Sequence, residues 1–197
     1  GMSYYGFQII EAFINAMNKN YLVDRAYCVW PDMEKLMREN DSPLSSVEYK
    51  KPVKDFDILA FTLPHEASYT NILTILNISG IPIKSEDRDK LCPIVIAGGY
   101  GAYVPEVLSE FIDVFGIGEA EALLPSLLPV LEDTKGMQRD EILKVCANVK
   151  GCYVPLCYDG HTVERQITHE IFMLDSMIVP SVSIVHDRAA IELFRGC

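Results

Sequence analysis

Apolar residues follow two different spacings along this chain. In residues 4–18 they recur every three or four positions, which predicts an amphipathic helix. The apolar positions of that helix are Phe7, Ile10, Phe13, Ile14 and Met17. Residues 56–63, by contrast, are apolar at nearly every position, which is typical of a parallel strand covered on both faces.

The same two patterns alternate through the first three quarters of the sequence. Further strands are predicted at residues 25–30, 93–97 and 112–117, with a short edge strand at 44–49. Further helices are predicted at residues 31–40, 65–79, 105–111, 119–131 and 141–149. Such alternation indicates right-handed βαβ crossovers and an open, doubly wound parallel sheet. We therefore expect an α/β fold of the flavodoxin-like, three-layer αβα type over residues 1–150.

The pattern changes after Gly151. Two short β-like stretches, residues 152–158 and 162–167, flank Asp159-Gly160, a dipeptide that favours a hairpin turn. Residues 172–184 contain two prolines and no clean periodicity. We expect a hairpin and linker over residues 151–188, followed by one more strand at 189–194 in a last segment, 189–197.

Composition excludes several classes of partner. Twenty-eight acidic and seventeen basic residues give a net charge of −11, and no basic cluster offsets it, so nucleic-acid binding is not expected. No apolar run reaches the roughly 18–20 residues that span a bilayer, and no signal peptide is recognisable. The six cysteines form no CxxC pair, and together these features favour a cytoplasmic protein without membrane contact.

Three loops carry the candidate binding chemistry. They follow the predicted strands 56–63, 93–97 and 112–117, and ligands of parallel sheets bind at the carboxyl ends of strands. Glycines in these loops would let the backbone approach a ligand closely. The simpler alternative is that sharp turns between strands and helices need glycine anyway. The candidate cofactor-binding residues are Thr62, Leu63, Gly98, Gly99, Tyr100, Gly116, Gly118 and Glu119.

The third loop, residues 116–121, does not have the pattern of a phosphate site. Its sequence Gly-Ile-Gly-Glu-Ala-Glu is not GxGxxG, and two acidic side chains at a helix start would repel phosphate. A flavin- or nucleotide-dependent oxidoreductase is therefore disfavoured. The cysteines at 146, 152 and 157 are not spaced like zinc ligands, and we expect buried thiols there.

The order of motifs resembles a known family. The chain opens with GMSYYGFQII and continues through VWPDME, the strand with FTL, SYTN, IAGG and GIGEAE. It then reaches VHDR and ends in Arg195-Gly196-Cys197. Over nearly its whole length this resembles the N-terminal part of radical SAM proteins that carry a cobalamin (B12)-binding-like domain ahead of the radical SAM barrel.

The resemblance implies a role for the last residue. In that family Arg-Gly-Cys opens a CxxxCxxC motif, whose thiolates hold a [4Fe–4S] cluster that binds S-adenosylmethionine. Cys197 would be the first cluster ligand of the full-length protein. Residues 189–197 would be the start of the radical SAM domain, with the first strand of its barrel, and this chain would be cut at that cysteine. We accordingly expect a fragment that is inactive alone, whose partner is its own C-terminal radical SAM barrel.

The resemblance also implies a possible cobalamin site. Thr62 and Leu63 resemble a Ser-x-Leu motif that contacts the nucleotide tail of cobalamin, and Gly98-Gly99 resemble the glycines beneath that tail. The usual Asp-x-His-x-x-Gly motif is missing from the sequence. The alternative is a cofactor-free, flavodoxin-like interaction or regulatory module, in which the three loops close on each other.

Finally, the resemblance implies that the first strand of the α/β domain is missing. In the family this strand precedes the Gly1-Met2-Ser3 motif and occupies the centre of the sheet. We expect the gap to be filled by the strand predicted at residues 189–194 or by a strand of a second copy. Either a homo-oligomer or strand exchange would result.

Overall fold

The computed structural model describes residues 5–18, 20–174 and 192, and these belong to two compact units. The smaller unit combines residues up to 23 with residues from 168 onward. Within it, α1 (Tyr5–Met17) confirms the first predicted helix, and the Phe13 and Phe172 rings meet edge to face at 5.4 Å. Of the strand predicted at 189–194 the structure describes Glu192 alone, and the Cys197 thiol lies outside the described residues.

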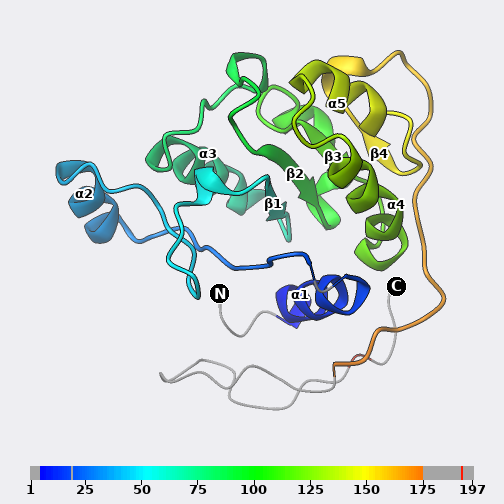
Figure 1. The fold of residues 1–197 in the computed structure, drawn as a ribbon, viewed down its shortest axis with the longest axis horizontal. Coiled ribbons are helices and arrows are strands. Elements are labelled where there is room, and N and C mark those ends of the chain that lie inside the picture. The colour runs from blue at the N-terminus through cyan, green and yellow to red at the C-terminus, as the bar shows by residue number, and fades with distance from the viewer. Residues whose placement is uncertain (1–4, 19, 175–191, 193–197) are drawn as a thin grey trace. The chain divides into compact units, whose positions relative to one another are not determined.

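The larger unit, residues 24–167, is built on a mixed four-stranded sheet among the described residues (Figure 1). The strands lie in chain order, β1-β2-β3-β4. The first three are parallel, whereas β4 runs antiparallel to β3. Their bounds are Ile58–Thr62, Ile94–Gly98, Val114–Gly116 and Cys152–Tyr153. The helices are α2 (Pro31–Glu39), α3 (Tyr69–Ile78), α4 (Ala120–Asp133) and α5 (Arg139–Cys146).

Alternate residues of β2 face opposite sides of the sheet and enter separate hydrophobic clusters. Val95 and Ala97 pack in the cluster that contains the buried face of α3. Ile94 and Ile96 pack in the cluster that contains α4 and α5. Helices therefore cover both faces of the sheet, which explains why the strand sequences are continuously apolar.

Two of the predicted strands do not form among the described residues. Residues 25–30 have no strand assignment, although Ala26, Cys28 and Val29 pack against the first cluster. Residues 44–49 contribute one isolated bridge, between Ser45 and Pro52. Both stretches have strand-like composition, but a strand also requires a neighbour with which to exchange hydrogen bonds.

The hairpin predicted around Asp159-Gly160 does not form either. Cys152 and Tyr153 pair with β3 and make the fourth strand of the sheet. Residues 162–167 instead meet the chain near the end of β3, where Gln166 bridges Gly118 in parallel. The prediction failed because the edge of β3 competes with the local turn for the same backbone groups.

The remaining helices match their predictions with shifted ends. The helix predicted at residues 105–111 is a 3₁₀ turn, Pro105–Leu108. α5 begins two residues earlier than predicted because Gln138 and Glu141 form a capping box at its start. Among the described residues, no helix has the length and apolar character needed to cross a membrane.

Candidate functional site

The end of β1 is tied to the loop after β2. The Leu63 amide donates a 2.8 Å hydrogen bond to the Gly98 carbonyl, and the Leu63 carbonyl accepts a 2.8 Å bond from the Gly101 amide. Thr62 pairs in register with Gly98. The Leu63 side chain is fully buried, in the same cluster as α3. The first and second predicted loops are therefore brought together by direct backbone contact.

Gly99 and Gly101 permit this approach. Gly99 has a φ of 101°, and a Cβ there would lie 3.1 Å from the Leu63 carbonyl oxygen. A Cβ at Gly101 would lie 3.0 Å from both the Leu63 Cβ and the Tyr69 hydroxyl. Tyr69 also donates a hydrogen bond to the Gly101 carbonyl at 3.2 Å. These glycines face the protein's own chain, so packing accounts for their presence.

Tyr100 has a different environment. Its side chain is 76% exposed, and its ring stands edge to face with the Tyr103 ring at 6.0 Å. Val104 and Val107 follow and are also exposed. The segment of residues 100–107, directly after the carboxyl end of β2, therefore exposes four large apolar side chains.

The third loop is closed by residues 164–167, which we call the closing segment. The Gln166 amide donates to the Ile117 carbonyl, and the Gln166 carbonyl accepts from the Glu119 amide, both at 2.9 Å. A Cβ at Gly118, whose φ is 125°, would overlap the Gln166 backbone. Glu119 is the N-cap of α4. The closing segment thus occupies the side of the turn where a ligand was expected.

The closing segment also links the second loop to the third. The Arg165 guanidinium lies over the Tyr103 ring, 5.4 Å from its centroid. A cation over an aromatic face is favourable, particularly where the pair is partly shielded from water. At the end of β3, Gly116 packs against the Leu123 side chain of α4: a Cβ at this position would lie 2.5 Å from that side chain. Nothing in the sequence of residues 164–167 indicates these contacts.

Cys146 and Cys152 are buried thiols, as predicted, whereas Cys157 is only partly buried. Burial raises the pKa of Cys146 to about 11 and that of Cys152 to about 12. Both therefore remain protonated at neutral pH and lack the thiolate form that binds metals and attacks electrophiles. Among the described residues, no group of three or more His, Cys, Asp or Glu side chains could hold a metal ion.

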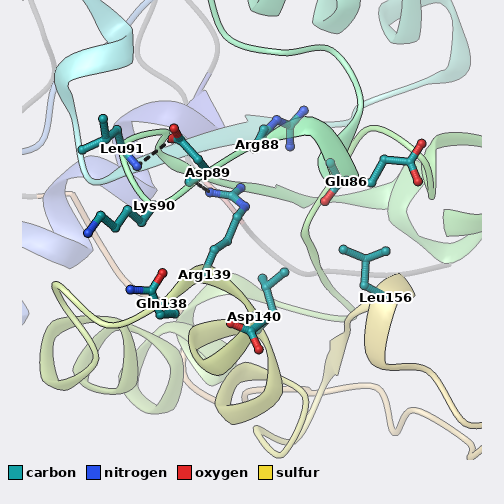
Figure 2. A pocket seen from close by; sticks show the side chains of 11 residues that line it. Glu86, Arg88, Asp89, Lys90, Leu91, Gln138, Arg139, Asp140 and Leu156 are labelled. Carbon is teal, nitrogen blue, oxygen red and sulfur yellow. Dashed lines mark hydrogen bonds between the residues drawn. The ribbon is translucent and has the colours of Figure 1, made fainter.

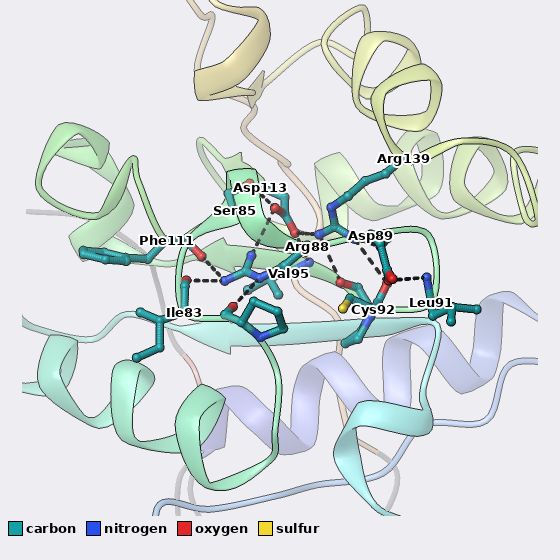
Figure 3. Close-up of polar contacts among 12 residues, drawn as sticks. Ile83, Ser85, Arg88, Asp89, Leu91, Cys92, Val95, Phe111, Asp113 and Arg139 are labelled. Carbon is teal, nitrogen blue, oxygen red and sulfur yellow. Dashed lines mark hydrogen bonds and ion pairs between the residues drawn. The ribbon is translucent and has the colours of Figure 1, made fainter.

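A charged cluster missed by the sequence prediction lies at the opposite end of the strands (Figure 3). Asp113, just before β3, is fully buried between two arginines. Its carboxylate accepts from Arg88 Nη1 at 3.1 Å, from Arg139 Nη2 and from the Ser85 hydroxyl. It also accepts from the Val95 amide at 2.6 Å. The sequence signal was an Asp inside the apolar run 112–117.

Both arginines also bind main-chain carbonyls, so the cluster fixes several segments of backbone. Arg88 donates to the carbonyls of Pro82, Ile83 and Phe111. Burial lowers the pKa of Arg88, while Asp113 raises it and Arg139 lowers it further. Because nearly all donors are satisfied, the arrangement is that of a structural cluster that joins the loops before β2 and β3 to the start of α5.

An open cavity of about 500 Å³ lies beside this cluster (Figure 2). Arg139 reaches into its wall from the start of α5, and the exposed Leu91 and Leu156 stand at its rim. Its acidic and basic side chains are equal in number: Glu86, Asp89 and Asp140 against Arg88, Lys90 and Arg139. The cavity lies away from all three predicted loops.

Comparison with known protein families identifies the family of this chain. A family model described as radical SAM proteins, N-terminal, matches residues 6–155, which is most of the chain. The chain belongs to this family. No curated protein and no solved structure shows a significant match to it. The family membership agrees with the resemblance seen in the sequence motifs, while the match itself does not extend to cobalamin.

Proposed function

We propose that this radical SAM N-terminal domain is a non-catalytic accessory domain that binds no cobalamin. Its strand ends serve as a docking face for the radical SAM domain of the same protein. The observation that carries the proposal is the closure of the three loops by the chain itself: Leu63 fills the space beside Gly99, and Gln166 fills that beside Gly118. The cofactor-free alternative expected the three loops to close on each other; the first two meet directly, whereas the third is closed by the closing segment.

The residues that resemble a cobalamin site do not fit cobalamin. A corrinoid with its nucleotide tail is a large ligand and would need an open cleft beside Gly98 and Gly99. Leu63 is fully buried there, and its carbonyl lies 3.1 Å from where a Gly99 Cβ would stand.

The exposed segment 100–107 supports a docking role. Tyr100 and Tyr103 are the kind of aromatic side chains that dominate protein–protein contacts, and Val104 and Val107 extend the apolar surface. The closing segment holds the chain at this same edge through Arg165 and Tyr103.

The cluster and S-adenosylmethionine belong to the radical SAM domain in this proposal. Cys197 would supply the first thiolate of the CxxxCxxC motif in the full-length protein. When bound, the [4Fe–4S] cluster would supply the site for S-adenosylmethionine and its reductive chemistry. The described residues contribute none of that chemistry, and their part is to fold and to present a surface.

Cobalamin retention tests the first half of the proposal. The full-length protein is incubated with hydroxocobalamin, desalted and measured by absorption spectroscopy, with a known cobalamin protein treated in parallel. We expect no corrinoid spectrum above that of a non-binding protein. A corrinoid retained at one equivalent per chain would overturn the proposal.

Hydrogen exchange tests the second half. Amides of residues 100–107 should exchange more slowly in the full-length protein than in the 197-residue chain. The double substitution Tyr100→Ser and Tyr103→Ser should abolish the difference. Tyr49→Ser is the matched control, because Tyr49 is also exposed but lies outside the three loops. Equal exchange in both proteins would exclude docking through this segment.

A further inference from the structure

The charged side chains of the larger unit are unevenly divided between the two ends of the parallel strands. Residues 62–83 and 91–134, which contain the loops after β1, β2 and β3, include no lysine or arginine. Lys150, before β4, and Arg165 reach this end of the sheet from later in the chain. Basic residues occur instead in the loops that precede β1 and β2: Lys54, Lys84, Arg88 and Lys90.

Three exposed glutamates lie close to segment 100–107, and each comes from a different part of the chain. Glu66 begins the turn that leads into α3, and Tyr69, the first residue of α3, donates a hydrogen bond to the loop after β2. Glu106 lies within the segment, and Glu164 is the first residue of the closing segment, which contacts it. None of these three carboxylates forms an ion pair with a described residue.

Helix capping accounts for only some of the acidic residues at this edge. Glu119 is the N-cap of α4 and Glu121 lies in its first turn, where a negative charge complements the helix dipole. Glu106, however, lies in a 3₁₀ turn of four residues, and Glu164 lies in no helix. Acidic side chains therefore occur at this edge even where no helix dipole favours them.

The chain itself shows which chemical group this surface accepts. The Arg165 guanidinium lies over the Tyr103 ring, where the face of an aromatic ring attracts a cation. The neighbouring Tyr100 ring is more exposed than that of Tyr103, and no cation of a described residue lies over it. Segment 100–107 thus presents a second aromatic face, close to carboxylates that the described residues do not neutralise.

We propose that the surface of the radical SAM domain that docks on segment 100–107 is basic, and that one of its lysine or arginine side chains lies over the Tyr100 ring. This inference rests on the docking role proposed above and adds the chemistry of the partner surface. Lysine or arginine side chains of that surface neutralise Glu66, Glu106 and Glu164. Opposite charges also fix the orientation in which two surfaces dock.

Hydrogen exchange of the full-length protein at two salt concentrations tests the proposal. Relative to the 197-residue chain, the amides of residues 100–107 should be protected at about 50 mM salt. At about 500 mM salt this protection should fall by about fivefold or more, because salt screens exposed charges. The triple substitution Glu66→Gln, Glu106→Gln and Glu164→Gln should cause a loss of similar size, about fivefold or more, at the lower salt concentration.

The matched control removes the same charge from the opposite end of the strands. It combines Asp55→Asn, Asp87→Asn and Asp133→Asn, all at exposed side chains. Asp55 and Asp87 precede β1 and β2, and Asp133 ends α4. Protection of residues 100–107 should be unchanged in this variant, and circular dichroism should show that both triple variants fold.

Two substitutions of Tyr100 test the position of the cation. Tyr100→Phe keeps an aromatic face and should keep the protection of the segment at low salt. Tyr100→Leu keeps an apolar side chain without that face, and its protection should fall by about two- to fivefold. Equal protection in the two variants would show that no cation lies over this ring.

The two proposals fail in different ways. Protection that is the same at both salt concentrations and in both triple variants would overturn the basic partner surface, while docking through the segment would stand. An absence of protection in the full-length protein at either salt concentration would exclude docking itself, and the basic surface with it.

Discussion

The Leu63 carbonyl accepts a 2.8 Å hydrogen bond from the Gly101 amide, and this bond ties the end of β1 to the loop after β2. Leu63 is itself fully buried. The loop can approach so closely because residues 99 and 101 have no side chains. The carboxyl edge of the sheet, where ligands of parallel sheets bind, is thus occupied by the protein's own backbone.

Gly99→Ala should destabilise the domain by about 1–3 kcal/mol, the cost of a strained backbone conformation in a residue with a Cβ. The added methyl would also press on the Leu63 carbonyl at 3.1 Å. Gly136→Ala is the control, because Gly136 has a similar φ of 90° but no atom within 4 Å of the added Cβ. Urea unfolding should show a larger loss for Gly99→Ala. Equal losses would mean that contact with Leu63 is unimportant.

Gly118→Ala should displace the closing segment. A Cβ at this position would lie 2.6 Å from the Gln166 nitrogen, which is too close for any side chain. Hydrogen exchange should then accelerate at the Glu119 and Gln166 amides, which depend on that segment. The Ile117 amide should keep its protection, because it bonds to Gly151 instead.

Gly160→Ala serves as the control for Gly118→Ala. Gly160 also has a positive φ, 96°, but no atom lies within 4 Å of an added Cβ. Exchange at Glu119 and Gln166 should therefore be unchanged in Gly160→Ala. If both variants accelerated exchange equally, the closing segment would not depend on close packing at Gly118.

Asp113→Asn should cost about 3–5 kcal/mol of stability, because it leaves two buried guanidinium groups without their shared counter-charge. The matched control is Asp140→Asn, whose carboxylate forms an exposed pair with Lys144 at 3.0 Å. Exposed pairs contribute little, so this variant should unfold at nearly the same urea concentration as the unaltered chain. A small effect of Asp113→Asn would show that the arginines are satisfied by main-chain carbonyls alone.

Stability should fall as pH rises above 9, in part because of Cys152. Burial raises the pKa of this thiol from 9.0 to about 12, so between these values the unfolded chain loses a proton that the folded chain keeps. The difference favours unfolding by about 1.4 kcal/mol per pH unit for one such thiol. In urea unfolding at pH 8, 9 and 10, Cys152→Ala should show a shallower decline. An identical decline would contradict the raised pKa.

The sequence predicted the central strands and most helices because the spacing of their apolar residues directly reflects which residues are buried. β2 is apolar on both faces since α3 covers one and α4 and α5 cover the other. Residues 25–30 have an equally strand-like composition but do not form a strand in the structure. Strand formation depends on a neighbouring chain, which a local pattern does not specify.

The candidate loops were correctly located at strand ends, but the sequence could not show what fills them. Gln166 lies 48 residues from Gly118 along the chain, and no motif links the two positions. The sequence could not predict the pairing of Asp113 with Arg139 either, because these residues lie 26 positions apart and no motif links them. Glycine in a turn indicates close approach but not the identity of the group that approaches.

The closing segment also has a mechanical consequence. Ile167 is the last residue of the larger unit, and Thr168 begins the return to the smaller one. The neighbouring Gln166 holds the turn after β3 through two backbone hydrogen bonds. Tension applied at Thr168 is therefore transmitted directly to the N-cap of α4. A pull on this connection would separate Gln166 from the turn at Gly118 before it disturbed either hydrophobic cluster.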